Sequence, residues 1–224
     1  MPGDASRSAA AVWAILRKEC RSEWRTRYGL NAALLFAVTT LTATSFVIGR
    51  IGGRTDILAA LLWIVLLFAA LASLAHTFVR EVEGHTLTLL RMIASPTSIA
   101  LGKLIFNLLF LIVLEAITVP LFLVLMGGPP LHWAPFLGVM GLGSLALAAA
   151  ATLVGAVIAQ TRGRGALFAA ISLPILLPVM AGAVSGTRGQ WNGVPVDAEL
   201  RLLGAYAAAL LGMSLVLYDH LWED

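Results

Sequence analysis

The chain contains six long apolar runs, separated by connections that hold most of its charged residues. An α-helix needs about 20 apolar residues to cross a hydrocarbon core of roughly 30 Å. With 59% hydrophobic and only 12% charged residues, the chain is more apolar than an ordinary soluble domain. The runs therefore predict an all-α, polytopic membrane protein. Its six transmembrane helices are expected at residues 30–48, 57–79, 104–126, 133–159, 166–184 and 202–218.

The basic residues predict how these helices are oriented. Cytoplasmic connections of membrane proteins carry an excess of Lys and Arg. Of the 15 Lys and Arg residues, eleven lie in the N-terminal segment and in the second and fourth connections. Both termini are therefore expected in the cytoplasm. The resulting division is a cytoplasmic N-terminal segment (1–29), a six-helix transmembrane domain (30–218) and a cytoplasmic tail (219–224). The net charge of +3 reflects topology and contact with membrane lipid, and does not indicate nucleic-acid binding.

The segment before the first run predicts an amphipathic interfacial helix. One set of residues recurs at helical spacing and would form its apolar stripe: Trp13, Leu16, Cys20 and Trp24. Basic residues fill other faces: Arg17, Lys18, Arg21 and Arg25. A helix of this kind lies flat in the headgroup region. Two interpretations remain open: a lipid anchor alone, or an anchor that also contacts a cytoplasmic partner.

The connection after the second run, residues 78–96, combines charge with amphipathicity. Its first residues are rich in charge, and Leu87, Leu90 and Ile93 then share one helical face. Such a segment cannot cross a bilayer, so we expect a cytoplasmic coupling helix between transmembrane helices 2 and 3, against which a soluble partner can push. The chain has no P-loop motif for ATP phosphates, so that partner would supply ATP hydrolysis. The candidate coupling residues are Glu81, Glu83, Gly84, Thr86, Leu87 and Leu90.

Candidate chemistry inside the membrane is sparse, and we expect no enzymatic activity from this chain. Glu115 is the only acidic residue within a predicted span, and ionisable groups at membrane depth usually face protein or water. It could lie on a substrate or proton path. We favour a protonated carboxyl that is hydrogen-bonded between helices, with Asn107 as its partner. His132, beside Trp133 at the outer interface, is a weak candidate for haem contact. No metal site is predicted.

Two spans have features that affect packing. The fourth span carries small residues at three- and four-residue steps, which let two helix backbones approach closely; we favour packing within the chain over packing on a second copy. These residues are Gly138, Gly141, Ser144, Ala148, Ala151, Gly155 and Ala159. The fifth span carries Pro174 and Pro178, which predict a kink or a break.

Taken together, these segments resemble a type-2 ABC transporter permease, and more narrowly the CcmB family (haem exporter protein B) of cytochrome c maturation. The segments that carry the resemblance are residues 16–21, 81–90, 162–167, 173–178 and 194–205. They follow one another in the family's order over nearly the whole chain. One departure lies in the coupling segment: the family commonly has Gly directly before Ser/Thr-Leu, whereas His85 stands between Gly84 and Thr86 here.

The resemblance implies a function in the bacterial inner membrane. Two copies would pair with two copies of the ATPase subunit CcmA, and the 81–90 element would fit a cleft of that ATPase. CcmC, CcmD and the haem chaperone CcmE would complete the system. The chain would use ATP energy either to export haem as a substrate or to release the haem-loaded chaperone. Two alternatives stay open: a type-2 ABC permease for a drug, lipid or polysaccharide, and a scaffold or intramembrane enzyme that works without an ATPase.

Overall fold

The protein, a computed structural model, is helical throughout the residues that the structure describes, which are 3–49, 53–83, 95–128, 132–159 and 164–220. Each of the six predicted spans lies within one helix. The helices are α1 (Gly3–Thr26), α2 (Tyr28–Ile48), α3 (Thr55–Glu83), α5 (Pro96–Met126), α6 (Trp133–Ala159), α7 (Arg164–Trp191) and α8 (Asp197–His220). Helix α8 begins at Asp197, five residues before the predicted span, and Asp197 and Glu199 lie in its first turn, where acids suit the positive end of the helix dipole.

Four segments in the described part of the chain are long and apolar enough to cross a membrane. They are Tyr28–Ile48, Pro96–Met126, Trp133–Val154 and Asp197–Leu217. In α3, the segment Thr55–Leu71 is apolar but shorter. The prediction of an all-α, multi-pass membrane protein is therefore confirmed, and the count of six spans stays a prediction.

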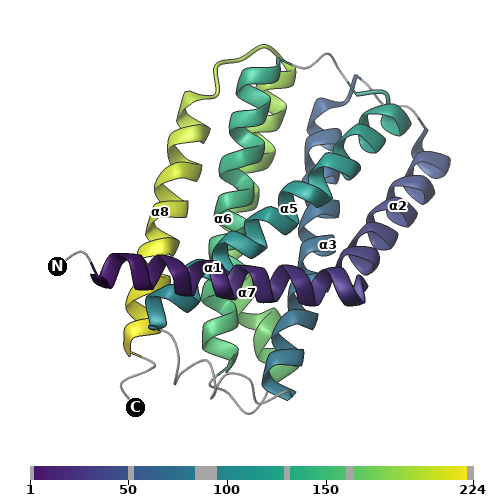
Figure 1. Ribbon diagram of the computed structural model, residues 1–224. Coiled ribbons are helices and arrows are strands. Elements are labelled where there is room, and N and C mark those ends of the chain that lie inside the picture. Colours follow the sequence, from purple (N-terminus) through teal and green to yellow (C-terminus); the bar gives the residue numbers. More distant parts are fainter. Residues whose placement is uncertain (1–2, 50–52, 84–94, 129–131, 160–163, 221–224) are drawn as a thin grey trace.

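Six helices run side by side as a bundle, and α1 crosses them (Figure 1). The second helix packs on α3 and α5, and α6 packs on α5, α7 and α8. Helices α3, α6 and α8 begin at one end of the bundle (Figure 1). We call this the outer end, because the predicted topology places the starts of these helices on the outer side of the membrane. The ends of α3 and α8 and the start of α5 lie at the opposite, inner end (Figure 1).

The small residues of α6 let neighbouring helices come close. Ser144, Ala148 and Ala151 are buried within the chain, as expected for packing inside one molecule. Gly143 faces the buried ring of Trp63 on α3, and a Cβ at Gly143 would collide with that ring. Gly141 differs, because a Cβ there would meet no atom of this chain.

The predicted break in the fifth span does not occur, because α7 continues through Pro174 and Pro178. A proline removes a backbone hydrogen bond and crowds the preceding turn, so a carbonyl in that turn needs another donor. The hydroxyl of Tyr206 on α8 donates to the carbonyl of Ile175 at 2.9 Å. A neighbouring helix thus supplies a hydrogen bond within the turn that precedes Pro178.

Candidate functional site

The predicted coupling element follows α3 in the chain and precedes α5; α3 ends and α5 begins at the inner end of the bundle (Figure 1). Glu81 and Glu83 belong to the last turn of α3. The other four candidates, Gly84, Thr86, Leu87 and Leu90, lie outside the described residues. The structure therefore describes the helices on both sides of the coupling element. It does not test the roles of the individual coupling residues.

On the far side of that element, α5 begins sharply. Pro96 occupies the first turn, where its missing N–H costs no hydrogen bond. The hydroxyl oxygen of Ser95 accepts a hydrogen bond from the backbone N–H of Ser98 at 3.4 Å. This N-cap satisfies one of the free N–H groups at the helix start. The helix begins eight residues before the predicted span, so Lys103 lies inside α5.

Helix α1 packs against this first part of α5. Ile15 and Leu16 are buried, and a Cβ added to Gly102 would lie 2.7 Å from Cγ2 of Ile15. Only glycine at this position allows the two helices to come so close. Of the predicted apolar stripe of α1, Leu16 packs against the protein, whereas Trp13, Cys20 and Trp24 are exposed, so their predicted contact with lipid stays a prediction.

Two charged groups are buried where α1 meets α5. Glu19 is 6% exposed and Lys103 is 5% exposed, and the carboxylate of Glu19 interacts electrostatically with the ammonium of Lys103. Lys18 Nζ also lies 2.9 Å from Glu19 Oε1. Removing one member of a buried pair leaves an uncompensated charge. Glu19, held by Lys18 and close enough to act on Lys103, is therefore a charged group at the α1–α5 contact whose loss should weaken the packing of α1 on α5.

A single residue joins α1 to α2. Arg27 adopts the left-handed conformation, with φ 51° and ψ 16°, and its guanidinium lies 5.2 Å from the ring centroid of Trp24. Glu23 Oε1 accepts a hydrogen bond from the backbone N–H of Leu30 at 2.8 Å. A carboxylate at this position satisfies a free N–H and matches the positive end of the helix dipole. The junction at Arg27 and the bond from Leu30 to Glu23 hold the end of α1 against the start of α2.

Deeper in the bundle, two polar pairs join α5 to α6. The Asn107 amide donates to Thr152 Oγ1 at 3.0 Å, and Glu115 Oε1 is hydrogen-bonded to Ser144 Oγ. The expected Asn107–Glu115 pair was wrong. Positions eight residues apart on one helix are separated by about 12 Å, and each side chain reaches across to α6 instead. Ser144 was noticed in the sequence only for its small size.

His132 lies at the outer end, where α6 begins. Its backbone N–H donates to Gln190 Oε1 at 3.1 Å, and its ring Nδ1 lies 3.2 Å from the Gln190 carbonyl. A carbonyl only accepts, so Nδ1 carries the proton and Nε2 of the neutral ring keeps its lone pair. Trp191, which follows Gln190 on α7, stacks with Phe122 and Phe136, each at 6.5 Å between ring centroids. His132 therefore ties α6 to α7 and retains one nitrogen that could bind a ligand.

The residues in the described part of the chain form no cluster of three or more His, Cys, Asp or Glu side chains suited to a metal ion. The polar groups that are brought together at the inner end serve docking between helices.

A family model described as CcmB protein matches residues 10–217. The chain belongs to the CcmB family. No curated protein matches the chain. Members of the CcmB family are permease subunits of ABC transporters in cytochrome c biogenesis and haem transport. The apolar helices fit this assignment to a multi-pass membrane subunit.

Proposed function

We propose that this CcmB chain transmits the ATP-driven motion of a CcmA ATPase to the membrane helices. The α3–α5 connection, with Glu81, Glu83, Gly84, Thr86, Leu87 and Leu90, would receive the motion as a coupling helix. The observation that carries the proposal is the attachment of α1 to both α5 and α2 next to this connection. A displacement there would move three helices as packed bodies, the kind of shear and rotation that switches proteins between discrete states.

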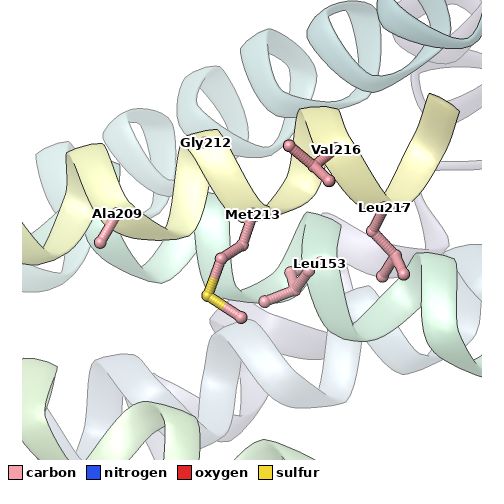
Figure 2. A pocket seen from close by; sticks show the side chains of 6 residues that line it. All are labelled: Leu153, Ala209, Gly212, Met213, Val216 and Leu217. Carbon is pink, nitrogen blue, oxygen red and sulfur yellow. The ribbon is translucent and has the colours of Figure 1, made fainter. Parts of the chain in front are cut away.

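We further propose that the chain acts with CcmC and CcmD to release the haem-loaded chaperone CcmE. In this proposal, the chain does not itself carry haem through the inner membrane. Among the described residues, two buried polar pairs link α5 to α6, Asn107 with Thr152 and Glu115 with Ser144, so these four side chains bind one another. The groove between α6 and α8 has a volume of about 630 Å³ and an apolar lining (Figure 2). The lining is Leu153, Ala209, Gly212, Met213, Val216 and Leu217, which gives the carboxylates of haem no cationic partner.

The proposal is tested by co-expressing the chain with CcmA and purifying the complex in detergent. The informative variant is Glu83→Lys, and the matched control is Asp56→Lys, a charge reversal at an exposed acid of the same helix near the outer end. We expect wild type and Asp56→Lys to retain CcmA, and Glu83→Lys to lose most of it.

If Glu83→Lys retains CcmA as well as wild type does, the contact lies elsewhere and the coupling role of the 81–90 element is wrong. If no variant retains CcmA even with CcmC, CcmD and CcmE present, the ATPase pairing itself is wrong. Haem that copurifies with the isolated chain, and is lost in His132→Ala, would show that the chain binds haem directly.

A further inference from the structure

The exposed side of α1 carries a basic strip and two tryptophans. At about 100° per residue, Arg17, Arg21 and Arg25 follow one strip, turned away from the buried Ile15 and Glu19; all three are exposed. Trp13 is 66% exposed and Trp24 is 76% exposed. The same rotation of about 100° per residue places both tryptophans next to this strip. We call this surface, Trp13, Arg17, Arg21, Trp24 and Arg25, the outward face of α1.

The attachments of α1 hold the outward face at the membrane surface. One attachment joins Glu23 to the N–H of Leu30, at the start of α2, and the other packs Ile15 on Gly102, near the start of α5. Both contacts lie where apolar spans begin, at the inner end of the bundle. A helix fixed at two such points runs along the bilayer surface, as the crossing of the bundle by α1 also indicates (Figure 1).

The charge on this face selects its partner. The acids of α1 in the part with described side chains point away from it, because Glu19 is buried and Glu23 caps α2. The exposed charge is therefore positive, which suits phosphate-bearing, anionic headgroups. Exposed indoles have an apolar body and a polar N–H, and they collect at the boundary between headgroups and acyl chains.

We propose that the outward face of α1 binds anionic phospholipid headgroups of the inner leaflet. Arg17, Arg21 and Arg25 bind the phosphates, and the two tryptophans insert among the headgroups. A basic residue near an anionic membrane surface strengthens binding about fivefold. Together, the three arginines give the chain a strong preference for anionic over zwitterionic lipid. This preference is independent of CcmA.

The test is a native mass spectrometry titration of the full-length, detergent-solubilised chain with phosphatidylglycerol and, separately, phosphatidylcholine. The variant carries Arg17→Gln, Arg21→Gln and Arg25→Gln. The matched control carries three equal changes at exposed arginines near the outer end: Arg54→Gln, Arg188→Gln and Arg201→Gln. We expect wild type and control to prefer phosphatidylglycerol at least tenfold, and the α1 variant to lose about tenfold or more of its affinity for that lipid.

An unchanged affinity for phosphatidylglycerol in the α1 variant would overturn the proposal. So would an equal loss in the control, because it would show a nonspecific charge effect. If the α1 variant keeps its lipid preference but no longer retains CcmA, the face binds the ATPase and the proposal is again wrong. Should the α1 variant fail to fold, the wild-type chain provides a second test. Its preference must fall steeply when salt is raised, and a salt-independent preference would reject the arginine contacts.

Discussion

At the scale of single residues, the hydroxyl of Ser144 lies within hydrogen-bond reach of two acceptors, which bears on the predicted neutral state of Glu115. Ser144 Oγ lies 2.8 Å from the Met140 carbonyl and also contacts Glu115 Oε1, but a hydroxyl has only one proton to donate. Thr152 shows how such a pair is satisfied: it donates to the Ala148 carbonyl at 2.8 Å and accepts from Asn107. The Ser144 hydroxyl is placed to donate to either acceptor, and a protonated Glu115 that donated to Ser144 would allow both bonds at once, as in the predicted neutral carboxyl.

Glu115→Gln should therefore be tolerated, because a neutral amide can donate to Ser144 in place of the carboxyl. We expect the stability to change by less than about 1 kcal/mol. Glu115→Ala loses the bond between α5 and α6 and leaves a cavity, at a cost of about 2–4 kcal/mol. Thermal unfolding in detergent, followed by tryptophan fluorescence, measures both. A Gln variant as unstable as the Ala variant would show that the ionised carboxylate is needed.

Residue partners were the part of the site that the sequence predicted least well. The composition of the span marked Glu115 as buried and paired, because a lone acid in an apolar run has few other choices. It did not identify Ser144, since a partner across a helix interface depends on the relative rotation of two helices. The same holds for Glu19, whose pairing with Lys103 requires knowing which side of α1 meets α5.

At the scale of elements, Gly143 of α6 controls how closely Trp63 of α3 approaches. Gly143→Ala should destabilise the protein by about 1–3 kcal/mol, the usual cost of overpacking, because the added Cβ collides with Trp63. Trp63 has little freedom to move, since its indole N–H donates to Thr187 Oγ1 at 2.8 Å. Gly141→Ala is the matched control on the same helix. It meets open space and should be neutral or stabilise by up to about 1 kcal/mol through helix propensity.

Unfolding midpoints of the two glycine variants in the same detergent decide this prediction. Equal midpoints would contradict the close α3–α6 contact. A large loss at Gly141 instead would indicate that this position packs on another chain in the detergent complex.

Existence and type of the elements were predictable, because the length of an apolar run is a local property of the sequence. All six predicted spans lie within helices. Continuity through Pro174 and Pro178 was not predictable, because prolines inside a span are tolerated where neighbouring helices pack and donate hydrogen bonds, as Tyr206 of α8 does to the carbonyl of Ile175. The docked side of α1 was also missed: amphipathicity reveals that a helix has distinct faces, but the buried Glu19 places the protein-facing side off the apolar stripe.

At the scale of the whole molecule, the predicted topology puts α1 in the cytoplasm and the α7–α8 connection outside the cell. Cys20 is the sole cysteine of the chain and is exposed on α1. Partial burial, and then the charge of Glu19, raise the pKa of its thiol. The reactive thiolate is therefore scarce at neutral pH, and maleimide labelling of Cys20 should accelerate as the pH rises toward that pKa.

A Cys20→Ser background therefore allows a topology test with one new cysteine at a time. Val194→Cys, at an exposed position between α7 and α8, should react with a membrane-impermeant maleimide in intact spheroplasts. Arg25→Cys, exposed on α1, should react only after the membrane is permeabilised. The reverse pattern would invert the orientation and place the α3–α5 connection out of reach of any cytoplasmic ATPase. Reaction of both cysteines in intact spheroplasts would require an even number of spans between them, so that at least one of the five predicted spans between Arg25 and Val194 would not cross the membrane.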